Sequence, residues 1–336
     1  MPAETQAVIK TLGPGRFMSP IRRSVNDATR LPLEVVRAPA LNGFQNVLFE
    51  LAGPREKLFF DPQKVRVGMV TCGGICPGLN TVIRSAFLEL HHFYGVKDVL
   101  GFRNGYRGLD PRHGLDPLML TPDLVDDIHK EGGTILGTSR GPVDAGVAVD
   151  DLITRGVNAL LVVGGDGTQR GAHEMFQEAQ KRGHALSVIG IPKTIDNDVP
   201  HVSRTFGYQT AVNEAARVIT CAHTEAHSVH NGISIVKLMG RHAGFIACEA
   251  AVASQDVNFC LIPEIPFKLD DRGGFLEALK QRVMKRAHAV IVVAEGAGQD
   301  LLKNNGGERD ASGNIKLKDI GQFLHQKIES YFAAEK

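Results

Sequence analysis

From residue 65 onward, short runs of aliphatic residues alternate with amphipathic stretches. The short runs are nearly continuous in apolar residues, which is typical of strands buried on both faces. They predict strands at 65–71, 159–165, 186–192, 233–239, 258–264 and 289–295. The longer stretches predict helices at 79–93, 121–131, 145–156, 168–182, 210–228, 242–254, 273–286 and 319–335. One helix has a clear start signal, because Thr121 can cap it and Pro122 suits its first turn.

The alternation of strands and helices predicts an α/β fold, with mainly parallel sheets covered by helices on both faces. In such sheets ligands bind at the carboxyl ends of the strands. The loops after residues 71, 165, 192, 239 and 264 are therefore the expected places for chemistry. Residues 1–60 differ, because they mix Pro, Gly and Arg with short apolar pieces. We expect an N-terminal extension there, packed on or beside the core.

Composition narrows the classes of function. A chain of 336 residues has room for two domains. Its net charge of +1 gives no overall attraction to nucleic acid or to an anionic membrane, so any phosphate binding must be local. The basic pair Arg22-Arg23 is interpreted as a solvated surface pair. No apolar run reaches the roughly 20 residues that span a bilayer. The five scattered cysteines favour a reduced, cytoplasmic protein.

The first candidate loop runs from Thr71 to Asn80 and contains the sequence GGICPGLN. Paired glycines allow backbone N–H groups to approach an anion, and the following helix directs its positive end toward it. Glycine-rich turns between a strand and a helix are common, however, so an ordinary turn remains the alternative.

The second candidate loop is GGDGT at 164–168, where two glycines leave a strand and a third opens a helix. Asp166 is a hard oxygen ligand that suits Mg²⁺ beside a polyphosphate held by glycine N–H groups. The alternative is an ordinary turn in which Asp166 caps the helix.

The third candidate loop is PKTIDND at 192–198, which brings Asp196 and Asp198 close to Lys193 and Thr194. Carboxylates this close repel each other unless a metal, a lysine or a substrate proton compensates. Such a group could take a proton from a sugar hydroxyl next to a metal-bound phosphate. The alternative is an Asx-turn that ends the strand.

Two further groups of residues contain potential metal ligands. His223 and His227 have helical i, i+4 spacing, and His230 follows them, but a zinc site needs further ligands. We interpret this segment as a partly exposed polar helix face. Cys72 and Cys76 flank the first glycine loop and are interpreted as small packing residues.

Seven motifs in order resemble the phosphofructokinase family. They are GGICPGLN (73–80), GTSRG (137–141), GGDGT (164–168), PKTIDND (192–198), TFGYQTA (205–211), MGRHAG (239–244) and PE (263–264). The N-terminal extension and Lys193 resemble the plant- and protist-type branch, which is related to the pyrophosphate-dependent enzymes. The resemblance implies two three-layer αβα lobes: a nucleotide-binding domain at 61–209 and a sugar-phosphate-binding domain at 210–336 that is incomplete at its C-terminus.

The resemblance also implies roles for individual residues. The nucleotide would be held by Gly73, Arg140, Gly141, Gly165, Asp166, Gly167 and Thr168, with Mg²⁺ at Asp166. Fructose 6-phosphate would be bound by Thr194, Ile195, Asp196, Met239, Gly240, Arg241 and Glu264. Asp196 would act as general base for the 1-hydroxyl, while Thr194 and Asp198 would support the transferring phosphoryl group. The implied reaction is the glycolytic phosphorylation of fructose 6-phosphate by ATP, in an allosteric homodimer or homotetramer.

Gly167 and Lys193 bear on the choice of phosphoryl donor. Pyrophosphate-using members carry Asp where Gly167 stands, in the space of the nucleotide α-phosphate, so glycine favours ATP. Lys193 points the other way, but the plant-type ATP enzymes combine it with this glycine. A pyrophosphate-dependent phosphofructokinase is therefore the alternative. An NAD kinase or lipid kinase is supported by GGDGT alone and is opposed by PKTIDND and MGR.

The sequence departs from the family pattern at two places. Gly232 stands where bacterial enzymes have an arginine supplied by the neighbouring subunit, a change shared by the plant-type branch. In the family, the chain also continues past the helix at 319–335, and the segment at 306–314 is interpreted as a solvated loop. We therefore expect a truncated chain that binds nucleotide weakly and turns over slowly. An inactive fragment or regulatory partner is a further alternative.

Overall fold

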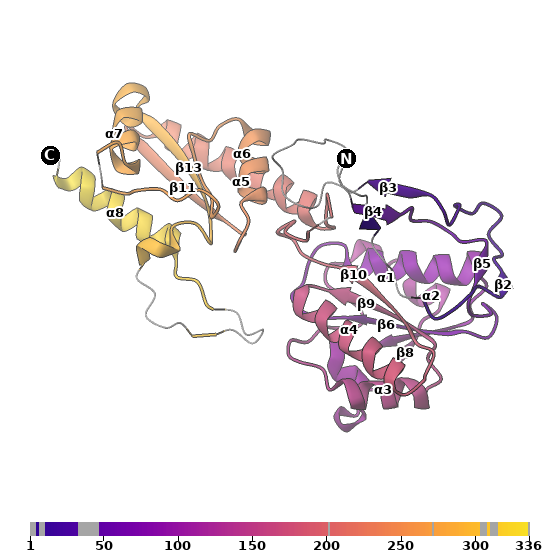
Figure 1. Ribbon diagram of the computed structural model, residues 1–336. Coiled ribbons are helices and arrows are strands. Elements are labelled where there is room, and N and C mark those ends of the chain that lie inside the picture. The colour runs from indigo at the N-terminus through magenta and orange to yellow at the C-terminus, as the bar shows by residue number, and fades with distance from the viewer. Residues whose placement is uncertain are drawn as a thin grey trace. The chain divides into compact units, whose positions relative to one another are not determined.

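The computed structural model describes residues 5–6, 11–32, 47–200, 202–270, 272–302, 308–309 and 315–334 (Figure 1). Contacts between residues divide the chain into two compact units, Met1–Pro192 and Lys193–Lys336. The division places the start of the PKTIDND loop at the unit boundary, whereas the second domain was predicted to begin at residue 210. Most of the segment 306–314, interpreted as a solvated loop, lies outside the described residues.

Unit 1 is built on a five-stranded sheet with the order β10-β9-β6-β7-β8. Its strands are β6 (Arg66–Thr71), β7 (Asp98–Phe102), β8 (Leu118–Met119), β9 (Ala159–Gly164) and β10 (Ser187–Pro192). Its helices are α1 (Leu79–Leu88), α2 (Pro122–Val125), α3 (Ala145–Thr154) and α4 (Asp166–Lys181). All neighbouring strands are parallel except β8, which runs antiparallel to β7.

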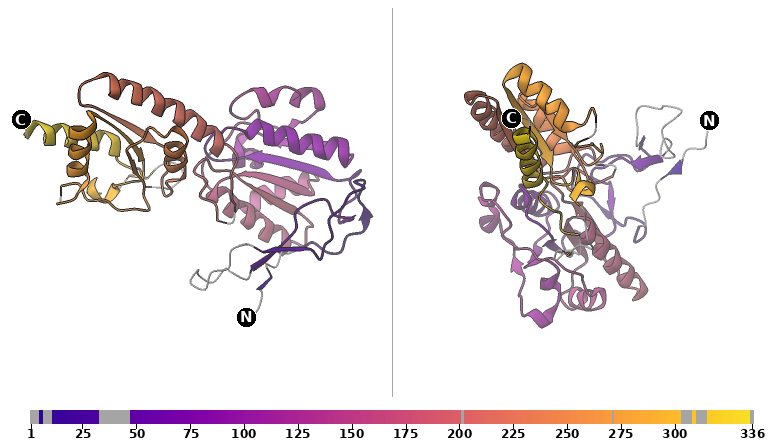
Figure 2. Two further views of the ribbon diagram at one scale, coloured as in Figure 1. Left: turned by 90° about the horizontal axis from the view of Figure 1, so that it is seen from above. Right: turned by 90° about the vertical axis from the view of Figure 1, so that its left-hand side faces the viewer.

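Both faces of this sheet are covered by helices (Figure 2). Successive strand residues point to opposite faces, so Val67 and Met69 share one face while Val70 lies on the other. The first face packs against Ile83 and Phe87 of α1, and the second packs against α3 and α4. Two apolar cores therefore enclose the sheet, which explains why its strands are apolar throughout.

The N-terminal extension forms small sheets of its own within unit 1. Their strands are β1 (Thr5–Gln6), β2 (Phe17–Met18), β3 (Arg30–Pro32), β4 (Val47–Glu50) and β5 (Lys57–Leu58). They pair as β1-β4-β3 and β2-β5. The Arg16 guanidinium lies 5.0 Å from the centre of the Phe59 ring, which joins the start of this segment to its end.

Unit 2 has a parallel three-stranded sheet with the order β11-β13-β12. Its strands are β11 (Gly232–Leu238), β12 (Phe259–Leu261) and β13 (His288–Ala294), and its helices are α5 (Tyr208–Ser228), α6 (Phe245–Ser254), α7 (Phe275–Arg286) and α8 (Ile320–Ala334). Val290 and Val292 of β13 pack toward α5 and α6, whereas Ile291 and Val293 pack toward α7 and α8. Unit 2 is therefore also a three-layer αβα structure.

The predicted α/β class with mainly parallel sheets is confirmed, and each predicted strand has a counterpart. The cap at Thr121 is also confirmed, because its hydroxyl oxygen accepts the Leu124 N–H at 3.2 Å. The helix predicted at 121–131 is broken into α2 and a 3₁₀ turn at Ile128–Lys130. Strands β7 and β8 were not predicted from the sequence. Among the described residues, no helix has the length and apolar character needed to cross a bilayer.

The central strand β9 supplies a test of the first core. Leu160 is fully buried, so Leu160→Ala removes packed methyl groups and leaves a cavity. We expect the free energy of unfolding to fall by about 2–5 kcal/mol, measured by urea denaturation with far-ultraviolet circular dichroism. Leu124→Ala is the matched control, since Leu124 is 41% exposed and should change stability by less than about 0.5 kcal/mol. Equal effects of the two substitutions would contradict this assignment of the core.

Candidate functional site

The candidate loops of unit 1 emerge at one edge of its sheet. Thr71 at the end of β6 pairs with Val163, and Gly164 at the end of β9 pairs with Pro192 at the end of β10. The three strands are parallel and end at nearly the same level. The loops that follow them therefore begin side by side, where parallel sheets bind their ligands.

Two of the glycine-rich segments are hydrogen-bonded to each other. The Gly73 N–H donates to the Ser139 carbonyl at 3.0 Å, and the Thr138 hydroxyl donates to the Gly73 carbonyl at 2.7 Å. Gly73 has φ +85°, a left-handed conformation that favours glycine. The Gly73 N–H therefore bonds within the protein and ties the first loop to the GTSRG segment.

Arg140 brings a positive charge to the first loop. A Cβ built on Gly74 would lie 3.6 Å from Arg140 Nη2, so the guanidinium sits directly beside the glycine backbone. Gly141 has φ +124°, and the space around its Cβ position is open. The loop thus has a bare backbone face with a cation beside it, which suits a phosphate group.

The start of α4 lies at the end of β9. Gly165 is the N-cap residue in an extended conformation, and Asp166 and Gly167 are exposed in the first turn. The alternative in which Asp166 caps the helix is therefore wrong. The unpaired N–H groups of a first turn and the helix dipole attract an anion. Thr168 is buried instead, 8% exposed, and packs closely on Gly164.

Gly167 stands in open space. A Cβ at this position would meet no heavy atom closer than Arg170 Nη2 at 3.9 Å. Its φ is not left-handed, so a larger residue would fit without strain. Folding therefore does not require glycine at position 167. The predicted preference for ATP, in contrast, depends on this glycine.

Tyr106 and Gln169 support these loops and were not predicted. The Tyr106 hydroxyl donates to the Thr168 carbonyl at 2.5 Å, and burial raises the pKa of this phenol well above its usual range. The Gln169 amide donates to the Gly164 carbonyl at 2.9 Å and to the Ile191 carbonyl at 3.3 Å. Gln169 thereby joins the ends of β9 and β10. Neither residue belongs to a sequence motif that would have marked it.

In unit 2, the PKTIDND loop is ordered by its own side chains. The Thr194 hydroxyl donates to Asp198 Oδ1 at 2.8 Å and accepts the Asp196 N–H at 3.1 Å. Lys193 is buried, 7% exposed, and Ile195 packs against the core between the sheet and helices α5 and α6. The turn is therefore closed by a threonine oxygen, which differs from the Asx-turn considered as the alternative.

Asn197 holds the same loop from its other side. It has φ +57°, and its side-chain oxygen accepts the Thr205 N–H at 2.8 Å, while its amide donates to the Ser203 carbonyl at 3.3 Å. Asparagine tolerates this left-handed conformation better than most residues. Asn197 therefore fixes the direction of the loop around Asp196, a role that the sequence analysis did not assign.

Asp196 is the most unusual carboxylate of the site. Its Oδ2 accepts the Arg241 N–H at 3.4 Å, while its Oδ1 is buried and has no hydrogen-bond partner among the described residues. Burial raises the pKa of Asp196, and the hydrogen bond from the Arg241 N–H only partly opposes this shift. The nearby charges of Asp198 and Glu295 add smaller increases, and His242 lowers the pKa slightly. A desolvated carboxylate with one oxygen atom that accepts no hydrogen bond is well suited to accept a proton.

The MGRHAG loop places Arg241 beside Asp196. Gly240 has φ +133°, and its carbonyl accepts the Gly296 N–H at 3.0 Å, so the backbone turns sharply after β11. The Arg241 guanidinium donates to the Ile315 carbonyl at 2.9 Å, and the Met239 side chain is exposed. The loop thus presents side chains to solvent while its backbone contacts the carboxylate.

Glu264 has a structural role that was not predicted. Its Oε1 accepts the N–H of Gly244, the N-cap residue of α6, at 2.8 Å. A Cβ on Gly244 would lie 2.4 Å from Ile262 and 3.0 Å from Glu264 Oε2, so glycine is needed for this close approach. Glu264 is therefore held at the N-terminus of α6, next to the MGRHAG loop.

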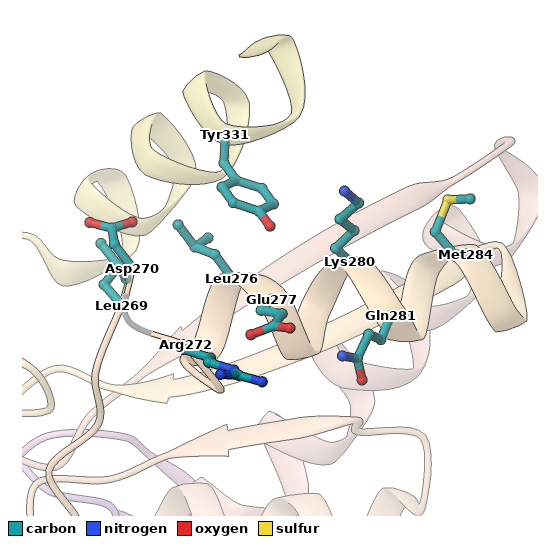
Figure 3. Close-up of a pocket in the computed structure, with 9 residues that line it drawn as sticks. All are labelled: Leu269, Asp270, Arg272, Leu276, Glu277, Lys280, Gln281, Met284 and Tyr331. Carbon is teal, nitrogen blue, oxygen red and sulfur yellow. The ribbon is translucent and has the colours of Figure 1, made fainter. Parts of the chain in front are cut away.

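A cavity of about 390 Å³ lies elsewhere on unit 2, between α7 and α8 (Figure 3). Tyr331 of α8 and Leu276 and Met284 of α7 contribute apolar surface, and charges of both signs surround them. The lining residues include none of the predicted site residues. Its mixed charges give no preference for a phosphorylated ligand.

The predicted residues therefore form two groups. Unit 1 brings together the first glycine loop, Arg140 and the start of α4. Unit 2 brings together Asp196, Arg241 and the segment from Gly244 to Glu264. The first group offers N–H donors, a cation and the Asp166 carboxylate, and the second offers the buried Asp196 carboxylate.

The chain is similar to known proteins over most of its length. The Phosphofructokinase family profile matches residues 66–335. The chain is 50% identical to ATP-dependent 6-phosphofructokinase 7 of Arabidopsis thaliana over 88% of its length and 61% of that protein. It is 44% identical to ATP-dependent 6-phosphofructokinase of Borreliella burgdorferi over 93% of its length and 71% of that protein. It therefore spans about three fifths of the Arabidopsis relative.

Solved structures of phosphofructokinases have a similar fold. Phosphofructokinase from Saccharomyces cerevisiae has a TM-score of 0.64 and 26% identity, covering 80% of this chain and 36% of that one. Pyrophosphate-dependent phosphofructokinase from Marinobacter aquaeolei has a TM-score of 0.65 and 21% identity. The similarity covers 80% of this chain and 66% of that one. With the profile match extending over most of its length, the chain belongs to the phosphofructokinase family.

Proposed function

We propose that this chain transfers the terminal phosphoryl group of ATP to the 1-hydroxyl of fructose 6-phosphate, giving fructose 1,6-bisphosphate and ADP. Its relatives named ATP-dependent 6-phosphofructokinase, at 44–50% identity, support this reaction. The observation that carries the proposal is Asp196, whose buried Oδ1 lacks a partner among the described residues. Such a carboxylate can take the proton of a hydroxyl as that hydroxyl attacks phosphorus.

The sugar phosphate would be bound by the loops of unit 2. Thr194, Ile195, Met239, Gly240 and Arg241 are proposed contacts on the two sides of Asp196. Glu264 Oε2 would accept a hydrogen bond from a sugar hydroxyl, because Oε1 already accepts one from the Gly244 N–H. The close contact of the Arg241 N–H with Asp196 supports this arrangement, since it ties the base to the sugar-binding loop.

The donor would be held by the loops of unit 1, with Gly73, Arg140, Gly141 and Gly165 to Thr168 around its phosphates. Asp166 suits Mg²⁺, since it is exposed at the start of α4 and Gly165 takes the N-cap position. Magnesium usually takes one or two protein carboxylates and completes its shell with water and phosphate oxygens, whose charge it neutralises. Lys193, Thr194 and Asp198 would act on the transferring group.

Pyrophosphate is the alternative donor, and Gly167 favours ATP. Open space at this position leaves room for the α-phosphate of a nucleotide, and the absence of a carboxylate removes a repelling charge. A cytoplasmic location and a homodimer or homotetramer stay predictions.

The donor is tested by coupled assays with fructose 6-phosphate and either ATP or pyrophosphate. We expect turnover with ATP and loss of that turnover in Gly167→Asp, because the new carboxylate would repel the α-phosphate. Gly167→Ala is the matched control, since a methyl group fits the open space without adding charge. Turnover with pyrophosphate alone, or an unchanged KM for ATP in Gly167→Asp, would contradict the assignment of the donor.

The role of Asp196 is tested by Asp196→Asn. We expect kcat to fall by about 10²–10⁴-fold while nucleotide binding is kept, because the amide cannot accept the proton. Steady-state kinetics and equilibrium binding of ATP measure the two effects separately. Asp300→Asn, a change at an exposed carboxylate, is the control. Near-normal turnover in Asp196→Asn would exclude its role as base.

The raised pKa of Asp196 predicts a pH-dependent stability difference. Because the folded state binds this proton more tightly than the unfolded state, the ionised carboxylate lowers stability above its folded pKa. Asp196→Asn should therefore have a higher Tm than the wild type at about pH 7. The difference should shrink as the pH falls toward about 4, the value of an unfolded Asp. Thermal unfolding at both pH values measures it, and a lower Tm for the variant at pH 7 would contradict the prediction.

A further inference from the structure

The segment that carries Asp196 is held on both sides of this residue. On one side, Ile195 packs against the apolar core that contains residues of α5 and α6. On the other side, Asn197 has φ +57°, and its side chain bonds to residues further along the chain. The two neighbours of Asp196 are thus fixed by different interactions, one apolar and one polar.

The Asn197 side chain uses both its oxygen and its nitrogen. Its Oδ1 accepts the Thr205 N–H at 2.8 Å and the Thr205 hydroxyl at 3.3 Å, and its amide donates to the Ser203 carbonyl at 3.3 Å. We call these three hydrogen bonds the Asn197 clamp. Thr205 is 3% exposed, so water has little access to its end of the clamp. A polar group left without a partner there would be costly.

Backbone conformation alone does not explain this use of an asparagine. Glycine adopts a left-handed φ without strain, whereas asparagine tolerates it. Asn231 also has φ +57°, but it is exposed and lies before β11, at the opposite end of that strand from the MGRHAG loop. The two asparagines therefore share a backbone conformation, and Asn231 allows the effect of that conformation to be measured separately.

The carboxylate of Asp196 depends strongly on the direction of its own backbone. Its Oδ1 has no hydrogen-bond partner among the described residues, and its Oδ2 accepts only the long 3.4 Å bond from the Arg241 N–H. Weak side-chain contacts leave Ile195 and the Asn197 clamp as the interactions that aim this group. A displacement of about 1 Å in a reacting group can lower a rate by about 100-fold.

We propose that Asn197 is a positioning residue for Asp196, and that its bonds to Thr205 and Ser203 keep this carboxylate buried and aimed at the hydroxyl it deprotonates. This inference rests on the proposed function. It adds that the geometry of the base depends on a side chain that acts through the protein rather than on the substrate. A clamp with a purely structural role would change stability but leave kcat of the folded enzyme unchanged.

Asn197→Gly tests the proposal, because glycine keeps the left-handed backbone and removes all three bonds of the clamp. With ATP and fructose 6-phosphate, we expect kcat to fall by about 10- to 100-fold and KM for ATP to stay unchanged. Asn231→Gly, the same change at the same φ, is the matched control and should keep the wild-type kcat. Circular dichroism checks that each variant is folded. A wild-type kcat in folded Asn197→Gly would overturn the proposal.

Two substitutions of Thr205 separate hydrogen bonding from packing. Thr205→Val keeps the volume and loses the hydroxyl donor, so kcat should fall by about 2- to 10-fold, as expected for one hydrogen bond. Thr205→Ser keeps the hydroxyl and loses a methyl group, so kcat should stay near that of the wild type. The reverse order, with a normal kcat in Thr205→Val and a reduced one in Thr205→Ser, would contradict the clamp.

A stability measurement tests the clamp without any turnover. Asp196→Asn removes a buried charge, and the resulting increase in Tm at about pH 7 should be smaller in the Asn197→Gly background, where Asp196 is hydrated. The nearby charges of Asp198, Glu295 and His242 are common to both backgrounds. A smaller increase in a chain that does not phosphorylate fructose 6-phosphate would contradict the proposed reaction and still support the clamp. Equal increases in the two backgrounds would overturn the clamp even in an active enzyme.

Discussion

The register of three parallel strands in unit 1 is the constraint on which the proposed donor site depends. Thr71, Gly164 and Pro192 end β6, β9 and β10 at nearly the same level. A shift of one residue would turn every side chain of a strand to the opposite face, and both faces are buried, so the two apolar cores fix this register. Because a change of register would expose apolar side chains of both cores, their packing also keeps the glycine turns at one edge of the sheet. Stability and site geometry arise here from the same packing.

Much of this arrangement followed from the sequence, because its signals are local. Continuous apolar strands, amphipathic helices and the cap at Thr121 each depend on a few neighbouring residues, and they predicted the fold class correctly. Strand β7 was missed because it is five residues long and is interrupted by Gly101. That glycine is explained by a distant residue, since a Cβ there would lie 2.4 Å from Leu136. The break after α2 carried no glycine or proline that would have marked it.

The finer features of the site depend on contacts between distant residues, which a single sequence does not display. The motifs named Glu264 as a sugar contact, but not as the acceptor for the N-terminus of α6. They named Gly73 as a nucleotide contact, but not as the donor to the Ser139 carbonyl. Asn197, Gln169 and Tyr106 act through backbone groups that have no sequence signature. The family resemblance supplied candidate roles, and the structure supplied the partners of each residue.

The open space around Gly167 has a consequence for substitutions at this position. A side chain at this position would contact little of the folded protein, so its replacement is nearly free of effects on folding. A substitution here that altered donor binding would therefore need no compensating change in the core. Gly164 and Gly244 differ in this respect, because a Cβ there would lie about 2.5 Å from the side chains of Thr168 and Ile262.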